Sequence, residues 1–459
     1  MISSSSLAKT CFILSVAALG VGYGVAAQRW AWFPSSFAQR AWSQAQSLTE
    51  TGPVSLMGGK GYDRHGVRMV SPGKIQPGLT LISSSWKNSG GWDPGLRLLD
   101  KRGRVVHKWR LNRENIFQES KTQRSRPSDT GVHGVQLLPG GDVVLNLEYV
   151  GMVRLDACGE VRWTLAEGNH HSIARAADGS FWTPGISPER RSKSKDHPGG
   201  FPGLRGRIVW IDRIINVSDE GKVLNKINVL DVIYKNGLDR HIEKMMGGLP
   251  ENPKLNRNID NVTHLNDVEP LRPSMADEYP LFERGDLLVS LRNLNLVFVI
   301  DPETRKIKWS SSSPFIYQHD PDFIGNSRIG VFDNNPSLVR TGKMIDKSRI
   351  VSLQPHTGSA EVLYPTQHSG PFFTKIMGKW QQLENGNLLL TEAQKGRVVE
   401  VGPDGRTVWE WTHKSSYNSK VPVVSKAIRV DVTREQVASW PCSSVDSTRT
   451  SIQKQQPTP

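Results

Sequence analysis

The chain has 459 residues, of which 22% are charged, and its formal net charge is +14. The 42 glycines and 28 prolines fit many tight turns, and a chain of this length can bury a large core. Part of the positive charge lies at 112–129 and 188–207, which are predicted loops, and basic and aromatic residues do not interleave as in nucleic-acid-binding proteins. We therefore expect no nucleic-acid partner. The basic loops are expected to form a rim that either attracts anionic substrates or faces solvent or a membrane.

The N-terminus carries an uncharged apolar run at 11–27, preceded by Lys9 and followed by Arg29. Such a run is typical of a cleaved export signal or a retained signal-anchor. We assign residues 1–30 to a signal peptide or signal-anchor and favour a single-pass membrane anchor. The rest of the chain is then expected on the periplasmic or extracytoplasmic side of the cell membrane. Residues 31–78 are predicted to form a lead-in segment.

A repeat of roughly forty to fifty residues recurs from 79 to 432. Its first half is an apolar strand, a turn with Gly, and a second strand. Its second half has an apolar pair ending in Asp, another turn, a β-branched pair and Trp, most clearly at 96–109, 152–163, 297–309 and 398–411. Alternating apolar residues between tight turns indicate strands, and four short strands per repeat are typical of a β-propeller blade. The recurring Trp is expected to pack between neighbouring blades.

The repeats predict an all-β, six-bladed propeller at 79–432, closed by N- and C-terminal strands and preceded by a transmembrane or signal helix. Five blades are complete, near 133–165, 171–228, 264–311, 318–365 and 378–413. The first, at 79–111, lacks its inner strand, which 425–432 can supply, so that no sheet edge is left bare there. An irregular β-sandwich is the alternative.

Three further segments complete the chain. Residues 229–247 have helical spacing and are predicted to form a lid or packing helix, whereas 433–459 is rich in Ser, Thr, Gln and Pro and is predicted to be disordered. Cys158 and Cys442 can pair in an oxidising compartment or remain as free thiols.

Four histidines occupy the same position in consecutive repeats: His133, His171, His264 and His319. In a closed ring of blades, one repeat position lies at one level around the axis. Four blades are therefore expected to direct imidazoles at a shared point, which is the candidate active site.

Polar neighbours suggest what this point binds. Asn266 follows His264 at i+2, on the same side of a strand, and Arg292 interrupts an otherwise apolar partner strand. Histidines, an amide and an arginine without a carboxylate cluster suit a small oxyanion group. Three histidines can also hold zinc or iron, but there is no His-x-His or His-x-x-x-His pair and an arginine beside a cation is repulsive. We therefore expect no metal and no cofactor.

The segments at 264–311, 318–335 and 383–411 resemble the bacterial arylsulfate sulfotransferases, a likeness that extends over most of 79–432. The resemblance implies a six-bladed propeller with its active site in the channel. It also implies transfer of a sulfuryl group from a phenolic sulfate ester to another phenol, without a nucleotide donor such as PAPS. The expected partners are thus a small-molecule aryl sulfate and a phenol, and the intermediate is a sulfated histidine.

By motif, the resemblance makes His319 the nucleophile. His264, Asn266 and Arg292 would hold the sulfuryl oxygens, and His171 would act as general acid or base, although His170 stands beside it. The chain departs from the related pattern in having Leu291-Arg292-Asn293 in place of Ser-Arg-His, and in a longer connection between Asn266 and Gly285.

Two other functional classes are consistent with a propeller. A quinoprotein-like dehydrogenase shares the Trp that closes the segment at 301–309, but it would have eight blades and a calcium site built from carboxylates. A non-catalytic envelope scaffold needs no site at all.

Overall fold

The structure is a computed structural model that describes residues 4–30, 56–88, 91–111, 116–117, 130–247, 260–336, 347–415 and 420–442. Its contacts divide the chain into two compact units, one with residues 1–54 and 88–92 and the other with residues 55–87 and 93–459. The first unit contains α1 (Ser4–Trp30), a helix of 27 residues that covers the predicted apolar run. Among the described residues, no helix combines the length and apolarity needed to span a membrane. The predicted membrane anchor is therefore not confirmed.

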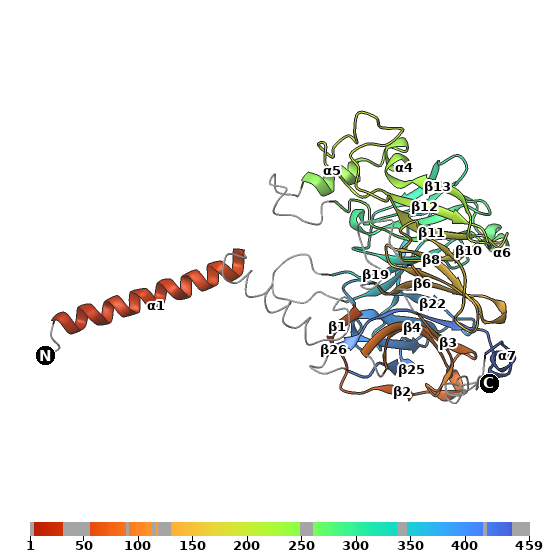
Figure 1. The fold of residues 1–459 in the computed structure, drawn as a ribbon, viewed down its shortest axis with the longest axis horizontal. Helices are drawn as coiled ribbons and strands as arrows, with labels where there is room; N and C mark the ends of the chain where they lie inside the picture. Colours follow the sequence, from red (N-terminus) through yellow and green to blue (C-terminus); the bar gives the residue numbers. More distant parts are fainter. Residues whose placement is uncertain are drawn as a thin grey trace, which may run out of the picture. The chain divides into compact units, whose positions relative to one another are not determined.

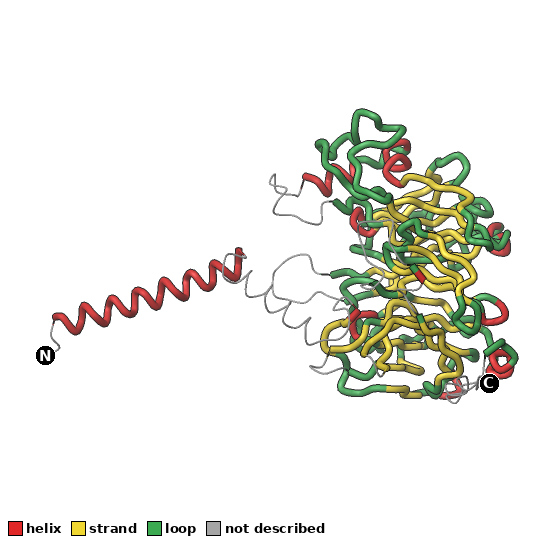
Figure 2. Tube along the Cα trace, in the orientation of Figure 1, coloured by secondary structure: helices red, strands yellow, loops and turns green. Residues whose placement is uncertain are grey.

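The second unit is a β-propeller (Figures 1 and 2). In the described part of the chain, antiparallel strands form six sheets of four or five strands, which confirms the predicted fold. From the inner strand outward, three sheets are β27 (Val424–Val430), β3 (Leu79–Asn88), β4 (Gly91–Leu99), β5 (Val105–Arg110); β6 (Val132–Leu137), β7 (Val143–Leu147), β8 (Gly151–Leu155), β9 (Val161–Leu165); and β10 (Ala174–Arg175), β11 (Phe181–Ile186), β12 (Asp212–Val217), β13 (Val223–Asn228). The other three are β14 (Leu265–Pro270), β15 (Leu287–Leu291), β16 (Leu296–Ile300), β17 (Ile307–Ser311); β18 (His319–Phe323), β19 (Ile329–Asp333), β20 (Arg349–Leu353), β21 (Ala360–Tyr364); and β22 (Trp380–Gln382), β23 (Leu388–Glu392), β24 (Arg397–Val401), β25 (Thr407–Thr412), with β2 (Gly66–Met69) at the outer edge.

First strands of neighbouring sheets contact one another, as β22 does with β27, β27 with β6, β10 with β14, and β14 with β18. These contacts identify them as the inner strands around the axis.

The ring is closed as the sequence predicts. β27 pairs antiparallel with β3, from Val424 opposite Ser84 to Val430 opposite Leu79, and so completes the first blade. The lead-in segment also contributes strands, because β2 extends the last blade by pairing with β25, and β1 (Met57–Lys60) pairs with β26 (Lys420–Pro422). Both chain ends thus cover sheet edges that would otherwise be bare.

The recurring Trp joins successive blades, as predicted. The indole N–H of Trp109 donates to the carbonyl oxygen of Gly141 at 3.0 Å, in the next blade along the chain. The Trp163 indole donates across the following boundary to Asp219 O at 2.8 Å, and the Trp409 indole donates from the last blade to Lys101 O of the first at 2.8 Å.

The segment at 229–247 forms two helices, α4 (Val229–Lys235) and α5 (Arg240–Gly247), and α4 buries its apolar side chains against the third blade. The longer connection before β15 contains α6 (Pro273–Ala276). Of the predicted basic loops, 188–207 is mostly irregular, and 112–129 lies almost wholly outside the described residues.

The C-terminal segment differs from the predicted disordered tail. Residues 434–438 form α7 (Arg434–Ala438), which begins with a capping box between Thr433 and Gln436. Val437 is buried and packs into the core of the first two blades, so local capping and apolar burial together order this stretch. Residues 443–459 lie outside the described residues.

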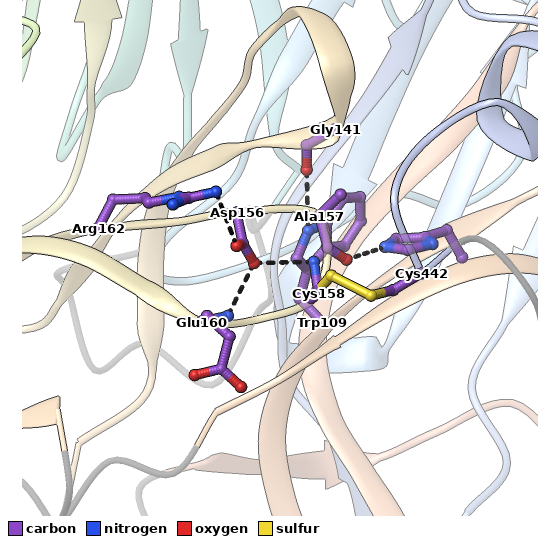
Figure 3. The surroundings of a disulfide bond; sticks show 9 residues. Trp109, Gly141, Asp156, Ala157, Cys158, Glu160, Arg162 and Cys442 are labelled. Carbon is purple, nitrogen blue, oxygen red and sulfur yellow. Dashed lines mark hydrogen bonds and ion pairs between the residues drawn. A yellow bond between two sulfur atoms is a disulfide. The ribbon is translucent and has the colours of Figure 1, made fainter. Parts of the chain in front are cut away.

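Cys158 and Cys442 form a disulfide that joins the C-terminal segment to the second blade (Figure 3). Their Cα atoms are 5.2 Å apart, although 284 residues separate them in sequence. Cys158 lies in the turn between β8 and β9, where Asp156 Oδ1 accepts hydrogen bonds from the backbone N–H groups of Cys158 and Glu160, each at 2.9 Å. A turn fixed in this way holds one half of the cross-link in place.

Candidate active site

The four predicted histidines meet around the propeller axis, where all four are buried. His133 lies on β6, His171 precedes β10, His264 precedes β14, and His319 begins β18. The ring centroids of His133 and His171 are 4.2 Å apart, and those of His171 and His264 are 5.1 Å apart. His319 lines the same cavity as His133 and His171. The structure therefore brings together the side chains that one repeat position predicts.

Local backbone irregularities accompany these side chains. The pairing register shifts at the site in three inner strands: between Val132 and Val135 in β6, between Leu265 and Asp267 in β14, and between His319 and Asp322 in β18. Such β-bulges redirect side chains and are frequent next to active sites. His171 and His264 adopt left-handed backbone conformations, with φ of 53° and 50°. Each costs about 1–3 kcal/mol, a strain that is common where a functional side chain must be aimed.

The protonated nitrogen of His319 follows from its contacts. Its Nδ1 lies 3.0 Å from the carbonyl oxygen of Tyr317 and 2.6 Å from Asn334 Oδ1. A carbonyl oxygen only accepts, so Nδ1 carries the hydrogen and Nε2 carries the lone pair. The Asn334 amide is oriented in turn, because its Nδ2 donates to the carbonyl oxygens of Thr374 at 2.9 Å and Met377 at 2.6 Å.

His319 is also held in its neutral form. Burial lowers its pKa to about 3, and the positive charge of Arg292 acts in the same direction. The hydrogen bonds to Asn334 and Tyr317 oppose the shift without reversing it. A neutral imidazole with an unprotonated Nε2 is a nucleophile at neutral pH.

His264 lies beside His171, and Asn266 lines the same cavity as His319. Asn261 Nδ2 donates to His264 Nδ1 at 2.5 Å, so the hydrogen of the neutral His264 ring belongs on Nε2. Asn266 lines the cavity, and its Nδ2 donates to Gln318 O at 2.8 Å. Asn266 Oδ1 is buried and makes no hydrogen bond to the described residues.

Arg292 follows β15 in a 3₁₀ turn (Arg292–Leu294), and its backbone N–H donates to His264 O at 3.1 Å. Its Nε and Nη2 both donate to Asn293 Oδ1, at 3.2 and 3.1 Å. Asn293 is one of the two residues, with Leu291, at which the chain departs from the related Ser-Arg-His pattern. In this chain that side chain orients the guanidinium.

His171 is connected to a second histidine and a carboxylate. His170 Nδ1 and His171 Nδ1 are 2.7 Å apart, and His170 Nε2 lies 3.6 Å from Asp212 Oδ1. Although burial acts to raise the pKa of Asp212, the contacts with His170, Thr263 and Leu265 lower it, so the group is a carboxylate. A carboxylate draws the hydrogen of His170 to Nε2, and His170 Nδ1 then accepts from His171 Nδ1–H.

This order of hydrogens leaves the lone pair of His171 on Nε2. Burial lowers the pKa of His171 well below its ordinary value, and the nearby histidines, His133 first among them, act in the same direction. His171 is thus a neutral base rather than an acid at neutral pH. The repeat position favours His171 over the adjacent His170 as the functional residue, and the structure gives the two rings different environments.

Two cavities lie beside His133, His171 and His319, and they adjoin each other, since His133 and Ser425 line both. The smaller, of about 40 Å³, is also lined by His171, Asn266 and His319. The larger, of about 180 Å³, mixes apolar and polar side chains, including Leu56, Pro94, Val132, Glu148, Tyr149, Met377 and Val423. A small polar cavity thus adjoins a larger, more apolar one.

A set of buried ionisable side chains in the same cavity wall was not predicted from the sequence. Asp267, Asp320, Lys379 and Lys426 line the smaller cavity, and Lys379 Nζ lies 2.5 Å from Asp320 Oδ1. Burial raises the pKa of Asp320 well above its ordinary value, whereas burial and the charge of Lys379 lower the pKa of Lys426 to about 8. The expected absence of carboxylates from the site is therefore wrong. Their signal is present in sequence, because Asp267 and Asp320 follow the predicted residues on their inner strands and Lys426 lies on the closing strand.

Among the described residues, one group has the composition of a metal site. His133, Glu148 and His171 each place a possible ligand atom within 4.8 Å of the others. His133 and His171 belong to the predicted ring, but Glu148 was not predicted from the sequence.

None of the curated proteins compared with the chain matches it. Similar solved structures include a protein of unknown function from Bacteroides caccae, with 13% identity and a TM-score of 0.47 over 78% of this chain and 100% of that one. Virginiamycin B lyase from Staphylococcus aureus has 12% identity and a TM-score of 0.33, over 63% of this chain and 72% of that one. Likenesses this distant carry no argument about function.

The family comparison is specific. The model of the arylsulfotransferase (ASST) family matches residues 134–414. This span includes His171, His264, Arg292 and His319, and it covers more than half of the chain. The chain therefore belongs to the arylsulfotransferase family.

Proposed function

We propose that the protein transfers a sulfuryl group from an aryl sulfate ester to a phenol through a sulfated His319. The observation that carries this proposal is the state of His319: Nδ1–H is held by Tyr317 O and Asn334 Oδ1, and burial keeps the ring neutral. Nε2 is thereby available to attack sulfur. Membership of the arylsulfotransferase family supports the same reaction class.

In the first step, His319 Nε2 forms a bond to sulfur while the bond between sulfur and the aryl oxygen breaks. The aryl oxide leaves with the electron pair. Asn266, which lines the smaller cavity with His319, and Arg292, whose charge acts on His319, are proposed to stabilise the charge of the sulfuryl oxygens together with the Nε2–H of His264. Sulfuryl transfer of this kind depends, like phosphoryl transfer, mainly on positioning and charge stabilisation.

In the second step, the acceptor phenol gives its proton to His171 Nε2 as its oxygen attacks sulfur. The bond between sulfur and His319 breaks, and the nucleophile returns to its neutral form. His171 then loses this proton to water, and the aryl oxide released in the first step takes one up from water, so that protons balance over a turnover. The chain through His170 to Asp212 stabilises the transient imidazolium of His171, which serves as the general base of this step.

The aryl groups of both substrates are expected in the larger cavity, beside the sulfuryl site. Its wall includes Leu56, Pro94, Met377 and Val423, which suit a flat apolar ring, and Tyr149. The sulfate itself would occupy the smaller, polar cavity.

We also infer that the propeller works outside the cytoplasm. Disulfides such as Cys158–Cys442 persist in oxidising compartments, and the apolar run at 11–27 is typical of export. A C-terminal alkaline phosphatase fusion, which is active only after export, is expected to be active. An inactive but intact fusion contradicts this location.

The central experiment is mass spectrometry of the protein after addition of an aryl sulfate without acceptor. We expect one sulfuryl group on the peptide that contains His319, and its loss when phenol is added. The His319→Ala variant should neither be labelled nor release phenol, whereas His197→Ala, which alters a histidine of the basic loop, should behave like wild type. A label on another peptide would refute the role of His319.

A further inference from the structure

A histidine pair and a carboxylate meet on the side of the channel that opens into the larger cavity. His133, Glu148 and His171 each contribute a nitrogen or oxygen atom within 4.8 Å of the others. We propose that these three side chains bind a divalent transition-metal ion with the preferences of Zn²⁺. The proposal depends on this donor set and its geometry, not on sulfuryl transfer.

The spacing of the donors fits a metal better than a direct hydrogen bond. His133 Nδ1 lies 3.4 Å from Glu148 Oε1, which is long for a hydrogen bond, and His133 Nδ1 is a buried atom without a hydrogen-bond partner. Two ligands of a tetrahedral Zn²⁺, each about 2.0–2.1 Å from the ion, are about 3.3–3.4 Å apart. His133 and Glu148 therefore already have the separation of two zinc ligands, and His171 is within reach as the third.

The third donor is already in the form that a metal requires. His171 Nδ1 is hydrogen-bonded to His170 Nδ1, so the lone pair on His171 Nε2 is the one that can bind an ion. Behind it, His170 approaches Asp212 at 3.6 Å. Metal-bound histidines are commonly oriented by a hydrogen bond from the second ring nitrogen to such an outer group.

The surroundings provide both shielding and access. His133 and His171 are buried, whereas the Glu148 side chain is 30% exposed and lines the larger cavity together with Tyr149. Two histidines and a glutamate with a fourth position open to a cavity form the donor set of catalytic rather than structural zinc sites. The larger cavity would admit the ion and then an oxygen ligand, such as water or a phenolate. At His171 Nε2 the ion and the proton of the proposed transfer exclude each other.

The test is metal binding by full-length protein without a histidine tag. After equilibration with Zn²⁺ or Co²⁺ and removal of free ions, we expect one bound metal per chain, and visible absorption of the Co²⁺ form typical of four-coordinate sites. Glu148→Gln and His133→Asn should each lower the affinity at least about 10-fold, and His170→Asn should lower it about 10- to 100-fold through the orientation of His171. Glu148 is partly exposed, so the first variant is expected to fold, which its thermal melt would verify.

The matched control is His197→Asn. His197 Nδ1 lies 2.9 Å from Asp231 Oδ1, a histidine–carboxylate pair outside the channel, and its loss should leave metal binding unchanged. Substoichiometric metal in the wild type, or equal binding by wild type and Glu148→Gln, would overturn the site. No aryl sulfate enters these measurements, so failure here and failure of the His319 labelling experiment are distinguishable.

Discussion

Acidification from about pH 7 to about pH 5 is expected to leave the rate of His319 sulfation unchanged. Burial, reinforced by Arg292, lowers the pKa of His319 to about 3. At about pH 5 such a ring is about 99% neutral, whereas an imidazole with the ordinary pKa of about 6.5 is only about 3% neutral. The structure therefore predicts a nucleophile that is about 30-fold more available in acid than an exposed histidine.

The assay is a rapid-mixing measurement of the first burst of phenol, with an aryl sulfate whose electron-poor phenol leaves without a proton. This choice isolates His319 from the proton transfer at His171. His319→Gln, which lacks the nucleophile, should show no burst at any pH. A wild-type burst rate that falls about 30-fold with a midpoint near 6.5 would refute the reasoning, because it would mean that His319 titrates like an exposed imidazole.

The same pKa has a consequence for stability. The folded-state pKa lies below the unfolded value of about 6.5, so the unfolded chain binds more protons between these values and acid favours unfolding. The contribution is absent above about pH 6.5 and amounts to about 2 kcal/mol of lost stability at about pH 5. Urea unfolding at the two pH values should show that wild type loses about 2 kcal/mol more than His319→Gln. Equal losses would contradict the shift.

Three further predictions concern the scaffold. Cys442→Ser removes a cross-link over 284 residues and should lower the free energy of unfolding by about 2–5 kcal/mol, seen as a lower Tm; an unchanged Tm would contradict it. Gly330→Ala places a methyl group into the Trp380 indole of the next blade and should destabilise by about 1–3 kcal/mol in thermal melts, whereas Gly73→Ala meets open space and should be nearly neutral. Asn334→Ala deprives two backbone carbonyls and the nucleophile of their partner, and should both lower Tm and slow the burst by at least about 10-fold; a normal burst from the folded variant would exclude Asn334 as a positioning residue.

The architecture was predictable because it repeats. Strand alternation and turn chemistry recur at a fixed period, so each blade reinforces the assignment of the others. Closure by 425–432 followed from one missing inner strand, and β27 occupies nearly that range. The position of the four histidines followed from the same repeat, because equivalent positions lie at one level around an axis.

What escaped prediction depends on contacts between distant segments. The repeat position favours His171 over His170 but does not show their different environments, which arise because Asp212, on the blade's third strand, approaches His170. Likewise, the hydrogen of His319 is placed by Asn334, whose amide is oriented by backbone carbonyls about 40 residues farther along the chain. The order in α7 depends on burial of Val437, which composition does not reveal.

The charged residues that were not predicted also show how polarity and charge change along the channel. On the inner strands, the neutral groups come first and the charges follow: Asn266 precedes Asp267, and His319 precedes Asp320. Because equivalent inner strands run in the same direction along the axis, these later positions form a second layer beyond the imidazoles. Asp267 and Asp320 are balanced there by Lys379 and Lys426, so this layer offers an anion no formal excess of positive charge. An anionic ester that enters from the histidine side is therefore expected to stop beside His319, where the positive charge of Arg292 acts.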